Sequence, residues 1–316
     1  HVEPFKEVYL QAPPGTDHFD LLGQEQTTDT RFEALELIPG LNIGGFFDAG
    51  DFDIETGSNI NVVQNFVKTW ESFKPQRDQT FVDQQQRYVD LHRPDGTPDV
   101  LQFIEHGTLN LVAQAEIIGH MAQTLTNAVL DNYHHLGDAA SITDGLPYNP
   151  DLGPYEVAAD GRSSGVKDDM WAFTSRNAGL DLRAATMFAA ASRALKGYND
   201  DLSARALQQS KRLLKEAEEL LANQPQDTLG WGGGSANAAT NLQLYISTGE
   251  KQYLDKFHEL LWPALELNVS WNILTALDAI PHLDASYKEK LRPYVVKYRE
   301  YIDGLEKENP YGVPIG

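Results

Sequence analysis

The chain has 316 residues, 41% of them hydrophobic, and is therefore long enough to bury a large core. It carries 25 Lys and Arg against 46 Asp and Glu, and the resulting net charge of −21 is spread along the chain, which excludes nucleic acid as a partner. Cysteine is absent, which excludes disulfides, a thiolate nucleophile and cysteine-based zinc sites. No apolar run is long enough to span a membrane.

The N-terminal part, residues 1–58, shows no sustained helical period and contains Pro13-Pro14-Gly15 and Gly44-Gly45, which predicts an irregular, loop-rich lead-in. The first residue is His1 and no signal-peptide pattern follows it, so we expect a processed or trimmed product. The first regular helix is therefore expected after residue 58.

Two amphipathic helices follow this lead-in. The segment 59–73 has apolar side chains at the spacing of an α-helix, at Val63, Phe66, Val67, Trp70 and Phe73. A second helix is predicted from Thr97 to about His120, with Thr97 as N-cap and Pro98 in its first turn.

Between 130 and 176 the period is lost in a stretch rich in Gly, Pro, Asp and Ser, which predicts a functional loop. The helical pattern then returns over 178–196, 204–223, 235–247, 252–265 and 271–281. A last helix from Ser286 has a capping box with Glu289 and contains Pro293, which should kink or split it. With roughly eight or nine helices and no convincing strand pattern, the sequence predicts an all-α fold.

The segment with the clearest chemistry is Gly44-Gly45-Phe46-Phe47-Asp48-Ala49-Gly50-Asp51. Its two aspartates are separated by a small Ala-Gly pair and flanked by aromatic residues, so one tight turn can point both carboxylates toward one spot. Sugar rings stack on aromatic side chains, and inverting glycoside hydrolysis needs one carboxylate to deprotonate water and an acid to protonate the leaving oxygen. The turn is therefore a candidate source of a catalytic base.

Other interpretations of this segment are open. A calcium loop of the EF-hand type begins in a similar way at Asp51, but it needs Gly and Glu where the chain has Thr56 and Val62, so an EF-hand is excluded. The segment also fits an ordinary Asp- and Gly-rich turn ahead of a helix. Ser58 or Asn59 fits as the cap of that helix whatever the function.

The stretch from Gly44 to Asp51 resembles the Gly-Gly-Trp-x-Asp-Ala-Gly-Asp signature of glycoside hydrolase family 9, with Phe46 in the place of the usual Trp. Weaker matches follow in the family's order along nearly the whole chain, at Gly96 to Leu101, Ala189 to Arg193, Thr248 to Leu254 and Asn309 to Val313. Their common order makes the resemblance more specific than any one of them.

This resemblance implies an inverting hydrolase of β-linked glycosidic bonds in a glycan of the β-glucan or cellulose type, with Asp51 as general base and Asp48 helping to hold the attacking water. It implies one catalytic domain over 1–316, folded as an incomplete (α/α)6 barrel, since about twelve helices form the complete one. The family's general acid is a Glu near its C-terminal end, which we expect beyond Gly316. The fragment alone should then be inactive, and the missing C-terminal portion becomes an expected partner beside the β-glycan.

The resemblance also implies contacts to the sugar, although the family's sugar-binding Asp-His-x-x-Trp has no counterpart around Asp144. We expect five side chains to bind substrate: Phe47, His134, His135, Asp144 and Trp171. The two histidines fit equally well as hydrogen-bonding groups of a buried loop, and the tryptophan fits equally well as packing beneath a loop. No cofactor is expected to be required, and calcium, which is common in the family, has no ligands that the sequence identifies.

Two alternative functions remain open. One is an exo-acting amino-sugar hydrolase of the same family, in which Asp144 would hold an ammonium group. The other is a non-catalytic carbohydrate-binding or helical interaction module. The resemblance further implies a secreted or periplasmic protein that binds neither nucleic acid nor membrane.

Overall fold

The computed structural model describes residues 8–16, 26–27, 29–48, 53–83, 85–86, 88–127, 143–222, 233–308 and 310–314. The chain divides into two compact units, His1–Ala217 and Glu218–Gly316. Eight α-helices and one 3-10 helix occur in these described residues, so the prediction of a mainly helical fold is confirmed. None of the described helices is both long enough and apolar enough to cross a membrane.

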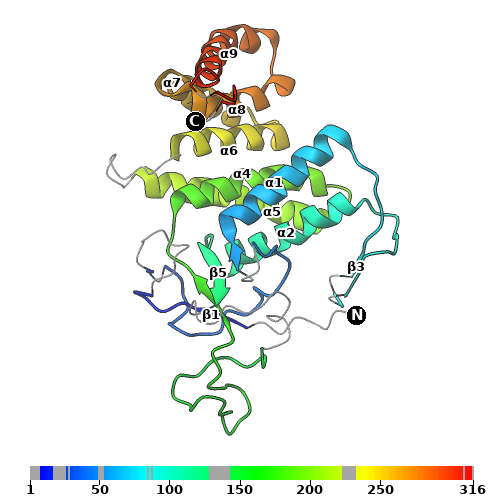
Figure 1. The fold of residues 1–316 in the computed structure, drawn as a ribbon, viewed down its shortest axis with the longest axis vertical. Coiled ribbons are helices and arrows are strands. Elements are labelled where there is room, and N and C mark those ends of the chain that lie inside the picture. The colour runs from blue at the N-terminus through cyan, green and yellow to red at the C-terminus, as the bar shows by residue number, and fades with distance from the viewer. Residues whose placement is uncertain are drawn as a thin grey trace. The chain divides into compact units, whose positions relative to one another are not determined.

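The first unit is built on a layer of helices. They are α1 (Thr56–Phe73), α2 (Asp99–Ile117), α4 (Ala178–Leu195) and α5 (Asp200–Ala222), the last of which runs past the boundary of the unit. Helix α1 contacts both α2 and α4, and Figure 1 shows α1 crossing α4. Small buried side chains such as Ala184, Ala185 and Ala191 let α4 approach its neighbours closely, and larger apolar side chains fill the remaining core.

A small sheet lies against this helical layer. Its four strands, in the order β1-β6-β5-β2, are β1 (Tyr9–Gln11), β6 (Met170–Phe173), β5 (Thr124–Asn127) and β2 (Ile54–Glu55). Strand β1 is parallel to β6, and the other neighbours are antiparallel. One face of the sheet forms a second core with the C-terminal part of α2, through residues such as Leu125, Ala172 and Ile118. A separate hairpin, β3 (Phe81–Asp83) and β4 (Tyr88–Asp90), follows α1.

The second unit is helical throughout its described residues. It contains α6 (Gly233–Thr248), α7 (Lys251–Leu267), α8 (Val269–Asp278), the 3-10 helix η4 (Ile280–His282) and α9 (Ala285–Leu305). Its core gathers around Phe257, Leu261, Ile273 and Leu291, all of which are almost completely buried. Each unit therefore has a hydrophobic core of its own.

Several local predictions need correction. The sequence showed no convincing strand, yet the described residues contain six short strands, because strands of two to four residues are too short to show an alternating pattern. The expected N-cap Thr97 is replaced by Pro98, which makes no side-chain cap hydrogen bond, and the expected capping box of Ser286 is replaced by a cap from Asp284. Pro293 does not split the last helix, which is continuous over Ala285–Leu305.

Candidate functional site

The predicted catalytic turn begins with Gly44 and Gly45, which cross α2 at close range. The N–H of Gly45 donates to the carbonyl of His106 over 3.0 Å, and His106 Nε2 lies 2.8 Å from the carbonyl of Gly45. Both glycines have a positive φ, and a Cβ on Gly44 would stand only 2.1 Å from the His106 carbonyl oxygen. Any other residue at Gly44 would therefore clash with the backbone of α2.

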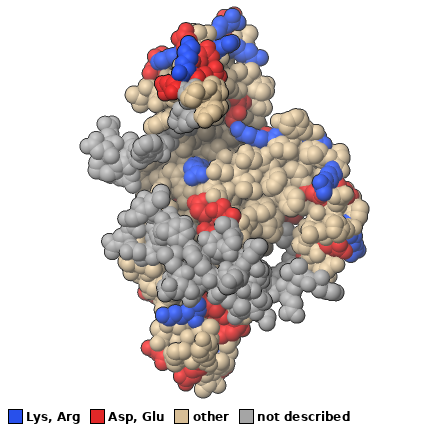
Figure 2. All heavy atoms as spheres, in the orientation of Figure 1, with Lys and Arg blue, Asp and Glu red and all other residues tan. Residues whose placement is uncertain are grey.

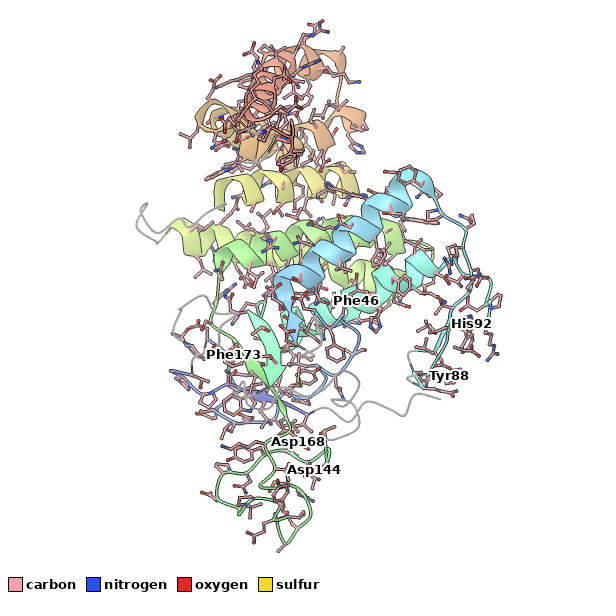
Figure 3. The ribbon with its side chains drawn as sticks, viewed as in Figure 1. Phe46, Tyr88, His92, Asp144, Asp168 and Phe173 are labelled. Atoms are coloured by element: carbon pink, nitrogen blue, oxygen red, sulfur yellow. The ribbon has the colours of Figure 1, made fainter. Side chains whose placement is uncertain are left out.

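Phe46 is the next residue of the turn, and its backbone is held by α1. The Asn59 side chain accepts from the Phe46 N–H and donates to the Phe46 carbonyl, both over 2.8 Å. The Phe46 ring packs between α1 and α2, edge-on to His106 at a centroid distance of 5.2 Å and 6.2 Å from Phe66. Phe46, labelled in Figure 3, is thus a structural anchor of the turn rather than a free stacking surface.

The turn closes just before the sheet. The N–H of Asp48 donates to the carbonyl of Asp53 over 2.9 Å, which joins the two ends of the turn, and the Asp48 residue is exposed. Asp51, the predicted general base, lies outside the described residues, so the predicted convergence of the two carboxylates stays a prediction. Beyond Asp53 the chain forms β2 and then α1, whose first turn is capped by the Glu55 side chain accepting from the N–H groups of Gly57 and Ser58.

Two predicted sugar-binding aromatics are partly buried. Phe47 packs against the core between the sheet and α2. Trp171 belongs to strand β6, where it pairs with Thr126, so this part of the predicted 130–176 loop is a strand. Its side chain packs with Phe173 and Ala12 instead of joining the core on the other face of the sheet. His134 and His135 lie outside the described residues.

The sheet brings the predicted catalytic turn and the described part of the predicted functional loop to one edge. Strand β5 is antiparallel to both β2 and β6, so the C-terminal end of β5 lies beside the N-terminal ends of the other two. Asp53 precedes β2 and Asp169 precedes β6, and only one strand separates them. Two strand spacings place these segments on the order of 10 Å apart across the sheet.

Three aspartates gather where the 143–169 segment meets this edge, and Figure 3 shows Asp144 and Asp168 next to each other there. The Asp144 N–H donates to Asp168 Oδ2 over 2.6 Å, and the Tyr148 N–H donates to Asp169 Oδ2 over 2.6 Å. The Oδ1 atoms of Asp168 and Asp169 are buried without a hydrogen-bond partner in the structure. Asp144 itself is exposed.

Burial and mutual repulsion shift the titration of this cluster. Burial, reinforced by the charges of Asp168 and Asp144, raises the pKa of Asp169 to about 8. Burial, together with the charge of Asp144, also raises the pKa of Asp168. In the part of the chain that the structure describes, no group of three His, Asp or Glu is arranged to hold a metal ion, so calcium still has no assigned ligands.

Comparison with known proteins places this geometry in a known fold. No protein-family model matches the sequence, and no curated protein matches it. A metagenome-derived glycoside hydrolase family 9 endoglucanase is 17% identical, with a TM-score of 0.57 over 91% of this chain and 49% of that one. A thermostable endoglucanase from Alicyclobacillus acidocaldarius is 14% identical, with a TM-score of 0.58 over 98% of this chain and 56% of that one. A Bacteroides ovatus family 9 protein is 15% identical, with a TM-score of 0.56.

The fold is that of the family 9 glycoside hydrolases. The predicted resemblance is thereby confirmed for the fold, and so is the expectation of an incomplete (α/α)6 barrel. The chain spans about half the length of these structures. At such low identity the likeness establishes the fold alone.

Four residues of this region were missed as site residues by the sequence reasoning: Asn59, His106, Asp168 and Asp169. Asn59 was considered only as a helix cap, and His106 had no signal at all, because its contact with Gly45 joins residues 61 positions apart. The Asp168-Asp169 pair did carry a signal, since adjacent acids directly before a short apolar run are visible in the sequence.

Proposed function

We propose that this protein is a glycoside hydrolase that cleaves β-linked glycosidic bonds of a β-glucan or cellulose type of glycan by inversion. Asp51 acts as the general base, and Asp48 orients the attacking water. The observation that carries the proposal is the Asp48 turn, which is fixed between α1 and α2 in a chain with the fold of family 9 endoglucanases.

The proposed substrate contacts come from the aromatic and polar side chains around this turn. Phe47, Trp171 and Asp144 belong to the described segments at the same edge of the sheet, and His134 and His135, which follow β5 in the sequence, lie outside the described residues. Figure 2 shows Lys and Arg interspersed with Asp and Glu on the described residues of the face it draws. Since β-glucans are extracellular polymers, we also propose a secreted or periplasmic location.

The proposal is tested by Asp51→Asn in the complete protein. The amide keeps the shape of the side chain but cannot accept the proton of water, so kcat on soluble β-glucan should fall by about 10²- to 10⁴-fold while glycan binding and the melting temperature stay nearly unchanged. Asp151→Asn, at an exposed loop aspartate, is the matched control and should keep full activity. Retained turnover in Asp51→Asn would move the base elsewhere, with Asp48 next to be tested.

A second candidate function, hydrolysis of an amino sugar from a chain end, is favoured by the three-aspartate cluster. An ammonium group can satisfy the carboxylate oxygens of Asp168 and Asp144 that lie at this edge of the sheet. Asp144→Ala should then lower the rate on chitosan oligosaccharides by about tenfold relative to the rate on β-glucan oligosaccharides. Equal relative rates before and after the change would refute this candidate and leave the neutral glycan.

A further inference from the structure

We propose that Asn59 and His106 are positioning residues for the catalytic turn, because together they fix the backbone that leads into Asp48. The inference rests on the proposed function, since the turn matters only if its aspartates act on a glycan. The role of Asn59 and His106 is to hold the backbone that carries Asp48, and not to take part in the reaction.

Asn59 holds the turn from α1. Only 1% of this residue is exposed, and its amide makes two 2.8 Å hydrogen bonds to the N–H and the carbonyl of Phe46. The two hydrogen bonds satisfy both backbone polar groups of Phe46, and only an amide side chain supplies both a donor and an acceptor in that geometry. The same amide also donates to the carbonyl of Glu55, the N-cap of α1, over 3.1 Å, so Asn59 ties the turn to the start of the helix.

His106 holds the turn from α2. Its Nε2 lies 2.8 Å from the Gly45 carbonyl, while its own carbonyl accepts from the Gly45 N–H. Burial lowers the pKa of His106, so the ring is neutral at pH 7 and donates to the carbonyl through Nε2–H. The ring also supports Phe46 edge-on. Gly45 and Phe46 are thus each held at both the N–H and the carbonyl, by two different helices.

These contacts determine where Asp48 lies. Asp48 follows Phe46 by two residues, and its N–H is tied to Asp53 at the start of β2. The described ends of the turn therefore rest on α1, α2 and the sheet, while the exposed Asp48 side chain makes none of the contacts that hold them. A displacement of about 1 Å at a catalytic group costs about 10²-fold in rate. Loss of the hydrogen bonds from Asn59 and His106 to the turn should therefore lower kcat more than it changes KM.

The test uses Asn59→Leu in the complete protein, with Asn241→Leu as the matched control. Asn241 is also a helical asparagine, is 2% exposed, and donates to the Asn237 carbonyl over 3.0 Å in the other unit. We expect Asn59→Leu to lower kcat by about 10- to 100-fold with KM changed less than about threefold, and Asn241→Leu to leave kcat unchanged at a similar loss of melting temperature.

A histidine series adds a rescue test. In His106→Gln the amide nitrogen can still donate to the Gly45 carbonyl, whereas in His106→Leu no donor is left. His106→Gln should therefore retain at least about fivefold more of the wild-type kcat than His106→Leu. Equal activities of the two variants would overturn the role of the Nε2 hydrogen bond.

Hydrogen exchange tests the same hydrogen bonds without depending on turnover. The Phe46 amide, which donates to Asn59, should exchange at least about tenfold faster in Asn59→Leu and unchanged in Asn241→Leu. Unchanged exchange would overturn the inference whatever the activity. Faster exchange of the Phe46 amide together with a wild-type kcat would show that the Asn59 hydrogen bonds do not position the catalytic group. Absence of turnover on every β-glycan by the unmodified complete protein would instead overturn the proposed function, and the positioning role with it.

Discussion

Asp169 shows how a carboxylate can be retained in an unfavourable place. Only 1% of the residue is exposed, its Oδ2 accepts one hydrogen bond from the Tyr148 N–H, and its Oδ1 is buried without a partner. Two neighbouring aspartates add repulsion, and the pKa rises to about 8. Near neutral pH the side chain is therefore largely protonated, which removes most of the cost of burying a charge.

This shift predicts a pH-dependent stability. The folded-state pKa of about 8 lies above the unfolded value of about 4, so the contribution of Asp169 is fully present below about pH 4 and is lost as the pH rises through 8. Asp169→Asn keeps an oxygen for the Tyr148 N–H and cannot ionise. The melting temperature of the variant relative to wild type should therefore increase from pH 5 to about pH 8 and level off above it. Asp160→Asn, at an exposed aspartate, should follow the wild type, and a variant curve parallel to wild type would contradict the shifted pKa.

At the scale of single residues, the sequence revealed the site only where the chemistry is local. The paired glycines and the aspartates of 44–51 form one contiguous motif, so their association needs no tertiary information. Asn59 and His106 act on this motif from two helices, and no periodicity links them to it. Their roles depend on how α1 and α2 pack, which a single sequence does not state.

At the scale of elements, helices were predicted well because their apolar faces repeat over several turns. The helix predicted at 59–73 is α1, which starts earlier, at Thr56, since Glu55 supplies the cap. The predicted helix at 178–196 and α4 agree to within one residue at the C-terminal end. Strands were missed because each pairs with a distant segment, as when β1 at residues 9–11 pairs with β6 at 170–173. The lead-in 1–58, expected to be irregular, likewise contains the two-residue β2.

One turn occurs twice in the first unit and was not predicted. Leu35 and Tyr155 both adopt a left-handed backbone, with φ of 65° and 67°. In each case the following glutamate folds back, so that Glu36 accepts from the Glu33 N–H and Glu156 accepts from the Gly153 N–H. The hydrogen bond to the glutamate side chain compensates for the strain of a large side chain at positive φ. The turn is too short to show a helical or strand period, so the sequence pattern did not predict it.

A network of ion pairs joins the ends of several elements. Arg176, just before α4, pairs with the buried Asp181 over 3.0 Å and with Glu216 of α5 over 2.8 Å. Arg212 also pairs with Glu216 and donates to the carbonyls of Ala115 and Gly119 at the end of α2. The Arg212 hydrogen bonds satisfy carbonyls that α2 leaves unpaired at its C-terminus. They therefore join α5 to the C-terminal end of α2, which is the end that packs against the sheet.

At the scale of the whole molecule, each unit has its own core but also large exposed apolar side chains. Phe73 is 80% exposed in the first unit, and Trp271 and Leu274, on one face of α8, are 62% and 64% exposed in the second. Faces of this kind commonly contact other protein surfaces. The chain spans about half the length of the structures that share its fold.

The same partial coverage leads to a prediction about activity, namely that residues 1–316 alone do not hydrolyse glycosides at a normal rate. An inverting mechanism needs a general acid roughly 6.5–9.5 Å from the base on the other side of the scissile bond, and from the resemblance we expect that acid to be a Glu of the family domain's C-terminal part. Turnover of β-glucan and chitosan oligosaccharides should be measured with purified 1–316, and again with the C-terminal remainder supplied in trans or in one chain. We expect activity only in the second case. Full activity of 1–316 alone would mean that a carboxylate within this chain is the acid, and Asp168 and Asp169, whose pKa values are raised at the same edge of the sheet as Asp48, would be the first to replace by Asn.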